Sequence, residues 1–327
     1  MARVGLVLGG GGITGAAYQM AGLMALELAT GWDPNDADVV VGTSGGAFVG
    51  AVLRCGGLNL DTLVKPHDTR EDVSKRLRSH VFRRPSNGEV GPTAYLGRWL
   101  RHGIVPGLRR PGVSLLLGSP ARFDPAGVGQ WLTEQVGESA SHWPDRPTIA
   151  TAYDLGARER VAFGTEDAPD VALADAVSAS SAVPLFFCPH RINGRDYVDG
   201  GILSGTHADL LLGSSDPLDV VIVLAPMAVE EERSGAWFHE RMFDRVGTTA
   251  LTAEMASLRE AWPGVEVLVF RPPASVLAVM RPNVMAPDAA VPSFVRSLVS
   301  FRRILARPEV WSVLHDHLAS AVGSQRR

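Results

Sequence analysis

Short, largely apolar runs alternate along the chain with glycine-rich turns and amphipathic segments, a pattern typical of α/β proteins. Residues 3–8 and 39–41 form two such runs, as expected of strands that are buried on both faces. Each run leads into glycines and then into an apolar helical pattern, over residues 13–29 in the first case and 47–53 in the second. This repeated order predicts a parallel sheet, because parallel neighbours need a crossover connection between them.

The remainder of the chain adds further strands, a hairpin and several helices. Residues 190–197 are predicted to form the hairpin because Asn193-Gly194 is a favoured two-residue turn, and the hairpin leads directly into Val198-Asp199-Gly200-Gly201. The other predicted strands cover 148–153, 160–163, 219–224 and 265–270, and the other predicted helices cover 237–262, 292–306 and 309–322. The expected fold class is therefore α/β with a mainly parallel sheet.

Composition narrows the class of protein without changing this picture. Hydrophobic residues make up 46% of the 327 residues and charged residues 20%, so the chain can bury a sizeable core and is not a disordered or disulfide-framework protein. A net charge of −4 argues against a nucleic-acid-binding protein. Cys55 and Cys188 match no metal or redox spacing, and we expect them to be small buried apolar side chains in a reducing compartment.

The length and the apolar runs of the chain bear on the number of domains and on the location of the protein. The length admits two domains or one large α/β domain. Glycines interrupt the first apolar run, so the apolar core of a signal peptide is missing, and no apolar run approaches the length of a membrane-spanning helix. We therefore expect a cytoplasmic protein.

The charge of the chain is unevenly distributed. Residues 65–122 hold 12 basic and four acidic side chains, a balance of +8 that leaves −12 for the remainder. Aromatic residues and leucines are interleaved with these charges and prolines divide the segment, which predicts a helical insertion over about 65–125. All basic residues of the chain except Lys65 and Lys75 are arginines. They reflect either coding bias or contacts to phosphate and carboxylate groups.

A sharp turn follows the second predicted strand. Its sequence, Gly42-Thr43-Ser44-Gly45-Gly46, matches G-x-S-x-G and lies between a buried strand and an apolar helix. This placement is typical of a nucleophile elbow, in which small neighbours hold a serine at a strained turn and the helix N-terminus stabilises negative charge. Ser44 is therefore a candidate nucleophile, with a tight glycine turn and an idle serine as the alternative.

The glycine loop after the first strand, Gly9 to Gly15, admits several interpretations. A phosphate-binding P-loop is excluded because the lysine of that motif is missing. Gly10, Gly12 and Gly15 fit the spacing of a dinucleotide-binding loop, but the second strand does not end in the acidic residue that this fold uses. The remaining interpretations are an oxyanion hole of backbone N–H groups and a cluster of glycines that packs a helix.

A general base is the third part of such a site. None of the nine histidines lies in an obvious strand-end loop near the C-terminus, where a triad would need one. Asp199-Gly200-Gly201 follows a strand pattern, and its glycines permit a tight turn that aims the carboxylate. A carboxylate can accept a serine proton when it is held within hydrogen-bond reach. Asp199 is the candidate base, with an ordinary Asp-Gly turn as the alternative.

Taken in order, these three motifs resemble those of the patatin-like phospholipase family. The G-G-G-x-[RK]-G loop, G-x-S-x-G elbow and D-G-[GA] block of that family correspond to Gly10 to Gly15, Gly42 to Gly46 and Asp199 to Gly201. The small-residue block Ala179 to Pro184 also looks similar to the family sequence before the aspartate. The resemblance covers about residues 3–225, and the ordered set is far more specific than any single motif.

The resemblance implies one domain over residues 1–327, a three-layer α/β/α patatin-like sandwich with a mainly parallel central sheet, a helical lid-like insertion and C-terminal helices at about 291–322. It also implies hydrolysis of phospholipids or other lipid esters by a dyad without histidine, metal or cofactor. Ser44 would be the nucleophile and Asp199 the general base and acid. The oxyanion hole would use the N–H groups of Gly10, Gly11 and Gly12. The supporting turns would be Gly42, Gly45, Gly46, Gly200 and Gly201.

Several points stay open on the sequence alone. The family carries Arg or Lys where this chain has Thr14, which bears on headgroup preference more than on the oxyanion role. His207 is interpreted as a cap or packing residue, with a catalytic contribution as the alternative. The same dyad would serve an acyltransferase, and a catalytically silent lipid- or nucleotide-binding module is a further alternative. The expected partner is a lipid or acyl-ester substrate, with peripheral membrane contact through residues 65–122 acting as a lid.

Overall fold

The structure, a computed structural model, describes residues 2–56, 58–85, 92–106, 116–119, 121–228, 238–280 and 283–319. Three sequence expectations lie partly outside these ranges. They are the basic segment 65–122, the start of the predicted helix at Trp237 and the end of the last predicted helix after Ala319.

The central sheet contains, within the described residues, β1 (Val4–Leu8), β2 (Val39–Thr43), β3 (Thr148–Asp154), β4 (Glu159–Phe163), β5 (His190–Ile192), β6 (Arg195–Asp199), β7 (Val220–Leu224) and β8 (Glu266–Phe270). Hydrogen-bonded pairs connect β5 to β6, β6 to β3, β3 to β2, β2 to β1, β1 to β7 and β7 to β8, and β4 also pairs with β3. The pairs among β3, β2, β1, β7 and β8 are parallel, whereas β4, β5 and β6 pair antiparallel. The predicted mainly parallel sheet is confirmed. The hairpin is confirmed as well, because Asn193 and Gly194 both have the positive φ that a tight two-residue turn needs.

The described helices are α1 (Gly12–Thr30), α2 (Gly45–Gly56), α3 (Arg70–Val81), α4 (Pro92–Trp99), α6 (Ala126–Val136), α7 (Leu173–Ser180), α8 (Phe238–Ala261), α9 (Ala274–Met280), α10 (Ala290–Leu305) and α11 (Pro308–Leu314). α1, α2, α8, α10 and α11 confirm helices predicted from apolar periodicity. α6, α7 and α9 were not predicted, because they are short and rich in small residues that weaken the periodic signal. In the described part of the chain, no helix has both the length and the apolar character needed to cross a membrane.

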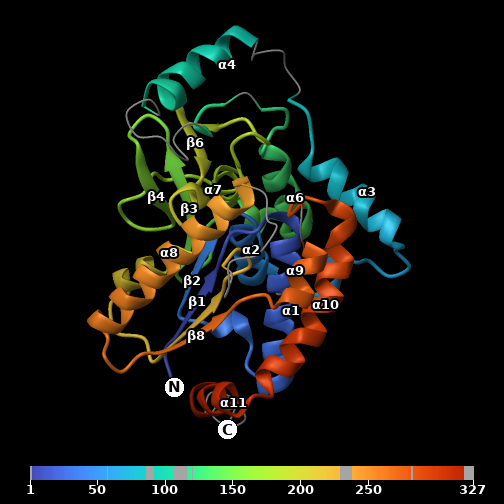
Figure 1. Cartoon of the computed structure of the whole chain (residues 1–327), viewed down its shortest axis with the longest axis vertical. Coiled ribbons are helices and arrows are strands. Elements are labelled where there is room, and N and C mark those ends of the chain that lie inside the picture. The colour runs from blue at the N-terminus through green and yellow to red at the C-terminus, as the bar shows by residue number, and fades with distance from the viewer. Residues whose placement is uncertain are drawn as a thin grey trace.

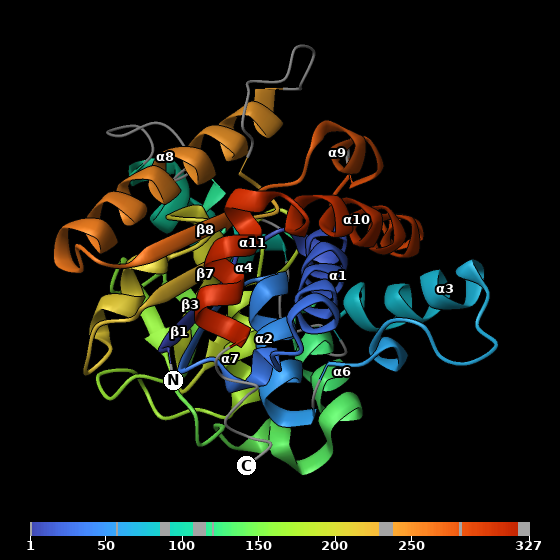
Figure 2. The same ribbon diagram turned by 90° about the horizontal axis from the view of Figure 1, so that it is seen from below.

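Helices cover both faces of the sheet (Figures 1 and 2). On one face α1, α2 and α10 pack over strand residues such as Leu6 and Val40. On the other face α8 and the short 3-10 helix η7 (Ala208–Gly213) cover residues such as Val7 and Val223. Successive strand side chains point to opposite layers, and burying each Leu or Val contributes about 1.5–3 kcal/mol. The three-layer α/β/α sandwich is therefore confirmed.

One edge of β3 brings two distant segments together. β4 and β6 both pair with residues 152–154 of β3, so they lie on opposite edges of that strand. β2 pairs with residues 148–151, two of which also pair with β4, so β2 lies on the same edge of β3 as β6. On the shared edge Thr43 of β2 pairs with Thr151, and Asp199 of β6 pairs with Ala152. Because β2 is parallel and β6 antiparallel to β3, the two strands run toward each other and meet end to end. The turns that follow them therefore lie side by side.

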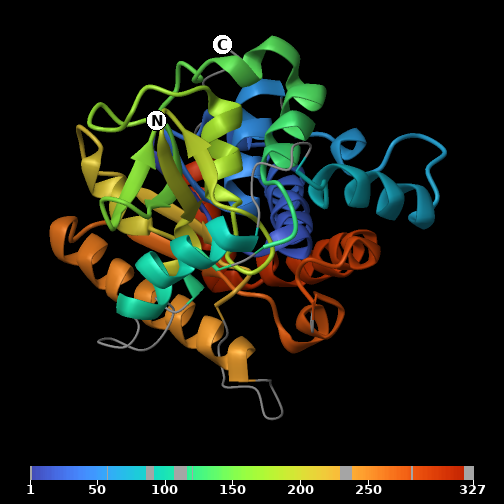
Figure 3. The ribbon, with the colours of Figure 1, turned by 90° about the horizontal axis from the view of Figure 1, so that it is seen from above.

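The described parts of the basic segment are helical, with α3, α4 and the π-helical turn η3 (Leu100–Ile104). α4 lies beyond the end of the sheet near β6, at the top of Figure 1 and nearest the viewer in Figure 3. Arg76 forms an ion pair with Asp68 at 2.6 Å, and Arg98 forms one with Asp196 at 3.3 Å. Some of the positive charge of this segment is thus neutralised within the fold, which favours a structural role for these two arginines.

Candidate active site

Ser44 lies in the turn between β2 and α2 and is only 6% exposed. Its φ of 55° is in the left-handed region, which residues with side chains seldom adopt. The turn depends on neighbours that lack side chains, because a Cβ on Gly42 would lie 2.6 Å from the Ala47 Cα and one on Gly46 would lie 2.0 Å from the Leu8 carbonyl oxygen. The serine is therefore held at the N-terminus of α2, where the helix dipole stabilises negative charge.

Contacts from neighbouring elements hold this turn in place. The Ser44 N–H donates to the hydroxyl of Ser180, at the end of α7, at 2.9 Å. The hydroxyls of Thr43 and Thr151 are 2.8 Å apart across the β2–β3 pair. In the sequence the block around Ser180 is marked only by its similarity to the family. The signal that could have identified Ser180 is a serine among small residues at the end of a short helix, where a buried hydroxyl needs a hydrogen-bond partner.

Asp199 is 4% exposed and lies against Ser44. Its carboxylate accepts, at 2.7 Å, the N–H of Gly201 in the 3-10 helix η6 (Gly200–Ile202), and the Ser44 hydroxyl lies near enough to lower the pKa of the carboxyl group. Burial raises the pKa of Asp199 to about 6, and the interactions with Ser44 and Gly201 offset part of this rise. At pH 7 the side chain is a carboxylate, and its raised pKa makes it a stronger proton acceptor than an ordinary aspartate.

The glycine loop between β1 and α1 runs beside Ser44, since a Cβ on Gly10 would lie 3.5 Å from the serine Cβ. The Gly10 N–H donates to the Gly205 carbonyl at 2.7 Å, so it is not available to a substrate oxygen, and the predicted oxyanion hole loses this member. Gly11 and Gly12 stand at the start of α1, where N–H groups have no acceptor within the helix. Among the described residues these two N–H groups have no backbone acceptor.

Two buried polar side chains of α1 fix the loop. The Gln19 amide donates to the Gly9 carbonyl, a contact that sequence analysis missed, although a glutamine on an otherwise apolar helix signals a buried hydrogen bond. The Thr14 N–H donates to the Val284 carbonyl at 3.1 Å, and its hydroxyl donates to the Met280 carbonyl at 3.4 Å. At position 14 the family pattern has Arg or Lys. In this chain the residue is a threonine, whose small side chain donates a hydrogen bond to the backbone at the end of α9.

His207 contacts the backbone that follows Asp199. Its Nε2 lies 3.0 Å from the Gly200 carbonyl oxygen, and its Nδ1 lies 3.3 Å from Nη1 of Arg160. Burial lowers the pKa of His207, so the ring is neutral at pH 7, with Nε2–H donating to the carbonyl and Nδ1 accepting from the arginine. The side chain makes no capping hydrogen bond to η7. These contacts support the packing interpretation rather than a cap.

A cavity of about 50 Å³ borders Ser44. It touches the glycine loop at Gly12, and its walls are almost entirely apolar. Phe48 of α2 and Trp131 of α6 are stacked at one wall, with ring centroids 4.4 Å apart. An apolar cavity beside a serine hydroxyl suits the alkyl part of an ester. The other large apolar side chains that line it are Ile13, Val81, Val128, Val183, Phe187 and Met285.

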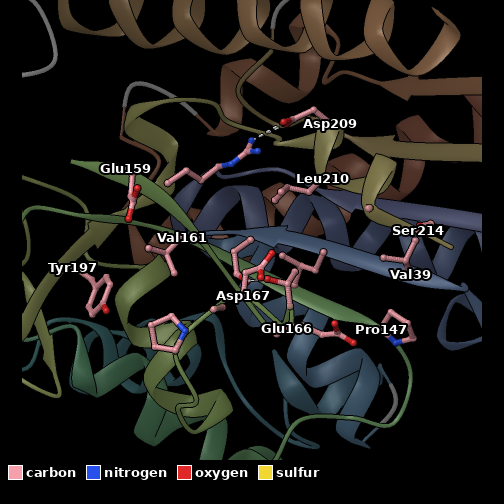
Figure 4. A pocket seen from close by; sticks show the side chains of 18 of the residues that line it. Val39, Pro147, Glu159, Val161, Glu166, Asp167, Tyr197, Asp209, Leu210 and Ser214 are labelled. Carbon is pink, nitrogen blue, oxygen red and sulfur yellow. Dashed lines mark hydrogen bonds and ion pairs between the residues drawn. The ribbon is translucent and has the colours of Figure 1, made fainter. Parts of the chain in front are cut away.

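A larger cavity of about 1210 Å³ lies elsewhere, over Val39 and Val161 of the sheet (Figure 4). Neither Ser44 nor Asp199 lines it. Its rim carries charged side chains, among which Arg160 pairs with Asp209 at 2.8 Å. This cavity is therefore separate from the candidate active site, and Arg160 connects it to His207.

A strained serine between strand and helix, a buried carboxylate against it and a glycine loop at the adjacent strand define an α/β protein with a nucleophile-elbow site. The model of the patatin-like phospholipase family matches residues 6–212, so the chain belongs to this family, and membership implies lipid acyl hydrolase activity. Among solved structures the chain is similar to VipD from Legionella pneumophila, with 15% identity, a TM-score of 0.40 and coverage of 97% of this chain and 67% of that chain. No curated protein matches the sequence.

Proposed function

We propose that the chain hydrolyses acyl esters of lipids through a Ser44–Asp199 dyad. The observation that carries this proposal is the position of the Ser44 hydroxyl next to the buried Asp199 carboxylate and beside an apolar cavity. The carboxylate can take the serine proton, and the cavity can take the alkyl part of the acyl group. Membership of the patatin-like phospholipase family supports the same reaction class.

The first half-reaction forms an acyl-enzyme. Asp199 accepts the Ser44 proton while Oγ attacks the carbonyl carbon of the ester, and the carbonyl oxygen becomes an oxyanion. The N–H groups of Gly11 and Gly12 donate to this oxyanion, and the positive ends of α1 and α2 add to its stabilisation. When the ester C–O bond breaks, the departing alcohol takes the proton from Asp199.

The second half-reaction releases the acid. A water molecule gives a proton to Asp199 as its oxygen attacks the acyl carbonyl carbon, and the same N–H groups stabilise the second oxyanion. The bond to Ser44 Oγ then breaks, the serine takes the proton back from Asp199, and the carboxylic acid leaves. Every proton in the cycle passes through one carboxylate, so the rate should follow its ionisation.

Covalent labelling across pH tests this proposal. A fluorophosphonate probe is expected to attach to Ser44, and the labelling rate should fall about ten-fold per pH unit below the Asp199 pKa of about 6, because only the ionised carboxylate accepts the serine proton. Mass spectrometry locates the label, and its rate is measured from about pH 5 to about pH 8. Folded protein that stays unlabelled at Ser44 throughout this range would instead favour a catalytically silent binding module.

Trp131 is expected to limit the length of the acyl chain. It is buried in the cavity wall against Phe48, and its Nε1 has no hydrogen-bond partner among the described residues, so truncation breaks no hydrogen bond. Trp131→Ala should raise kcat/KM for octanoyl relative to butyryl nitrophenyl esters about ten-fold, since the space of the indole takes about two further methylenes and each contributes about 0.8 kcal/mol. Trp131→Phe keeps the wall and should change this ratio little. An unchanged ratio in Trp131→Ala would place the acyl chain elsewhere.

Two broader features stay predictions. We place the whole catalytic unit in one domain over residues 1–327. We also place peripheral membrane contact on the basic segment 65–122, whose described part exposes Leu96, Leu100 and Val105. Apolar side chains beside arginines bind at the interface of a lipid surface, and co-sedimentation with anionic vesicles measures such binding.

A further inference from the structure

The loop of residues 200–208, which follows Asp199, touches both halves of the candidate active site. Gly201 donates to the Asp199 carboxylate, and the Gly205 carbonyl accepts the N–H of Gly10 in the glycine loop at 2.7 Å. The loop therefore contacts the candidate base at its start and the candidate oxyanion loop near its end. Its position sets the distance between the carboxylate and the N–H groups that would meet the oxyanion.

A buried carboxylate from α8 holds this loop. Glu254 is 7% exposed and accepts hydrogen bonds from the hydroxyls of Ser204 at 2.5 Å and Thr206 at 2.6 Å, and from the N–H of Ala208 at 2.9 Å. Ser204 and Thr206 flank Gly205 in the chain. Glu254 thus fixes the residues on both sides of the carbonyl that binds the glycine loop.

The hydrogen bonds around Glu254 require a carboxylate. The Ser204 hydroxyl oxygen already accepts the N–H groups of Thr206 at 3.1 Å and His207 at 3.2 Å, so it has only its proton to offer. The Ala208 N–H can only donate. Three donors therefore converge on the two carboxylate oxygens, and a glutamine would place its NH₂ group against at least one of them.

The Glu254 carboxylate also lies near His207 and Asp209. The atoms of these three side chains that could bind a metal ion lie within 4.8 Å of one another. Each of these groups is engaged by the protein itself. Arg160 donates to Asp209 at 2.8 Å (Figure 4), and the imidazole of His207 contacts Arg160 and the Gly200 carbonyl. A cation would have to displace the guanidinium and the three donors to Glu254. The contacts therefore point to a role within the fold.

We propose that Glu254 is a positioning residue, which holds residues 204–208 and thereby fixes the candidate base and the glycine loop relative to each other. Its effect on catalysis rests on the proposed function, whereas its effect on the order of the two loops does not. Loss of the carboxylate releases the Gly205 carbonyl from its position, and the Gly10 and Gly201 N–H bonds then weaken together. The oxyanion loop and the base move out of register with Ser44.

The variant Glu254→Gln tests the proposal, with Glu260→Gln, an exposed glutamate on the same helix, as the matched control. We expect Glu254→Gln to lower kcat for p-nitrophenyl butyrate between about ten-fold and a hundred-fold with KM nearly unchanged, because misplacement acts on the transition state. The acidic limb of its pH–kcat profile should move to higher pH, since the weakened Gly201 bond no longer lowers the Asp199 pKa. A loss of folded protein alone would lower the amplitude without moving this limb.

Amide hydrogen exchange gives a readout that needs no activity. Segments 9–12 and 200–208 should exchange faster in Glu254→Gln and at the wild-type rate in Glu260→Gln. If Glu254→Gln does not fold, Thr206→Val removes one donor at constant shape and should give the same changes at smaller size. Wild-type kcat, pH profile and exchange in the folded variants would overturn the proposal. If the wild-type chain hydrolyses no ester, the proposed function fails, and exchange alone still decides the role of Glu254.

Discussion

Replacement of Ser44 with alanine is expected to lower kcat for acyl-ester hydrolysis by about 10⁴-fold or more, because the serine Oγ forms the covalent bond to the acyl carbon. The substitution removes one hydroxyl and leaves the glycines of the turn intact, so the variant should fold like the wild type. Initial rates with p-nitrophenyl butyrate, normalised to folded protein, measure the effect. The same variant should also lose fluorophosphonate labelling.

Ser178→Ala is the matched control for this experiment. Like Ser44, Ser178 is a buried serine, but it lies on α7, where its hydroxyl donates to the Ala174 carbonyl of the same helix at 2.8 Å. Its replacement should leave the rate within a few-fold of the wild type, since it has no contact with the reacting groups in the proposed mechanism. A Ser44→Ala protein that hydrolyses the ester at the wild-type rate would contradict the dyad.

Replacement of Asp199 with asparagine is expected to lower kcat about 10³-fold, the middle of the range for general acid–base catalysis. Asparagine keeps the shape of the side chain and an oxygen that accepts the Gly201 N–H, but it cannot take the serine proton. The residual rate should also lose its acidic limb near pH 6, because the group that titrates there is gone. A pH–rate profile of the wild type and the variant measures both effects.

Stability separates this catalytic loss from a folding defect. Burial raises the pKa of Asp199 from 3.8 to about 6, so the folded state binds the proton more tightly than the unfolded chain. The resulting stabilisation is fully present below about pH 4 and is lost as the pH rises through about 6, and a shift of this size corresponds to about 3 kcal/mol. Asparagine does not ionise, so the variant does not lose stability in this way as the pH rises. Asp199→Asn should therefore unfold at the same or a higher urea concentration than the wild type at about pH 8.

Asp154→Asn is the matched control for Asp199→Asn. Asp154 is also a buried aspartate at a strand end, and it accepts the N–H groups of Gly156 and Ala157 at 2.7 and 2.9 Å. It has no contact with Ser44 in the proposed mechanism, so its replacement should cost stability and leave kcat within a few-fold. Equal losses of kcat in the two aspartate variants would contradict the assignment of Asp199 as the base.

The turn that carries Ser44 was predictable because its causes are local. Apolar residues at 39–41 indicate a buried strand, and Gly42 and Gly46 remove side chains where the strand and the helix come into contact. The Asn193-Gly194 turn is equally local, and it sets the pairing of β5 with β6 that delivers Asp199 to the end of its strand. In both cases a few consecutive residues determine the backbone.

The role of single polar groups was less accessible. Glu254 stands at helical spacing with Leu251, Met255 and Leu258, so a buried carboxylate could have been suspected from the sequence. Its donors Ser204 and Thr206 lie 50 and 48 residues away, and no pattern within α8 indicates them. Likewise, the sequence could not show that the Gly10 N–H is used by the Gly205 carbonyl, because the partner comes from a distant loop.

By itself, the sequence determined the α/β class, the elbow at Ser44, the hairpin before Asp199 and the order of the three motifs, because periodicity and glycine turns act over a few residues. The tertiary structure decided that Asp199 reaches Ser44, since β2 and β6 meet end to end on one edge of β3 at Thr151 and Ala152. It also decided which N–H groups of the glycine loop remain available to an oxyanion. A further outcome of the tertiary structure is that α8 holds the loop that contacts both Asp199 and the glycine loop. These arrangements depend on pairing and packing between segments far apart in the chain, for which local sequence carries no periodic signal.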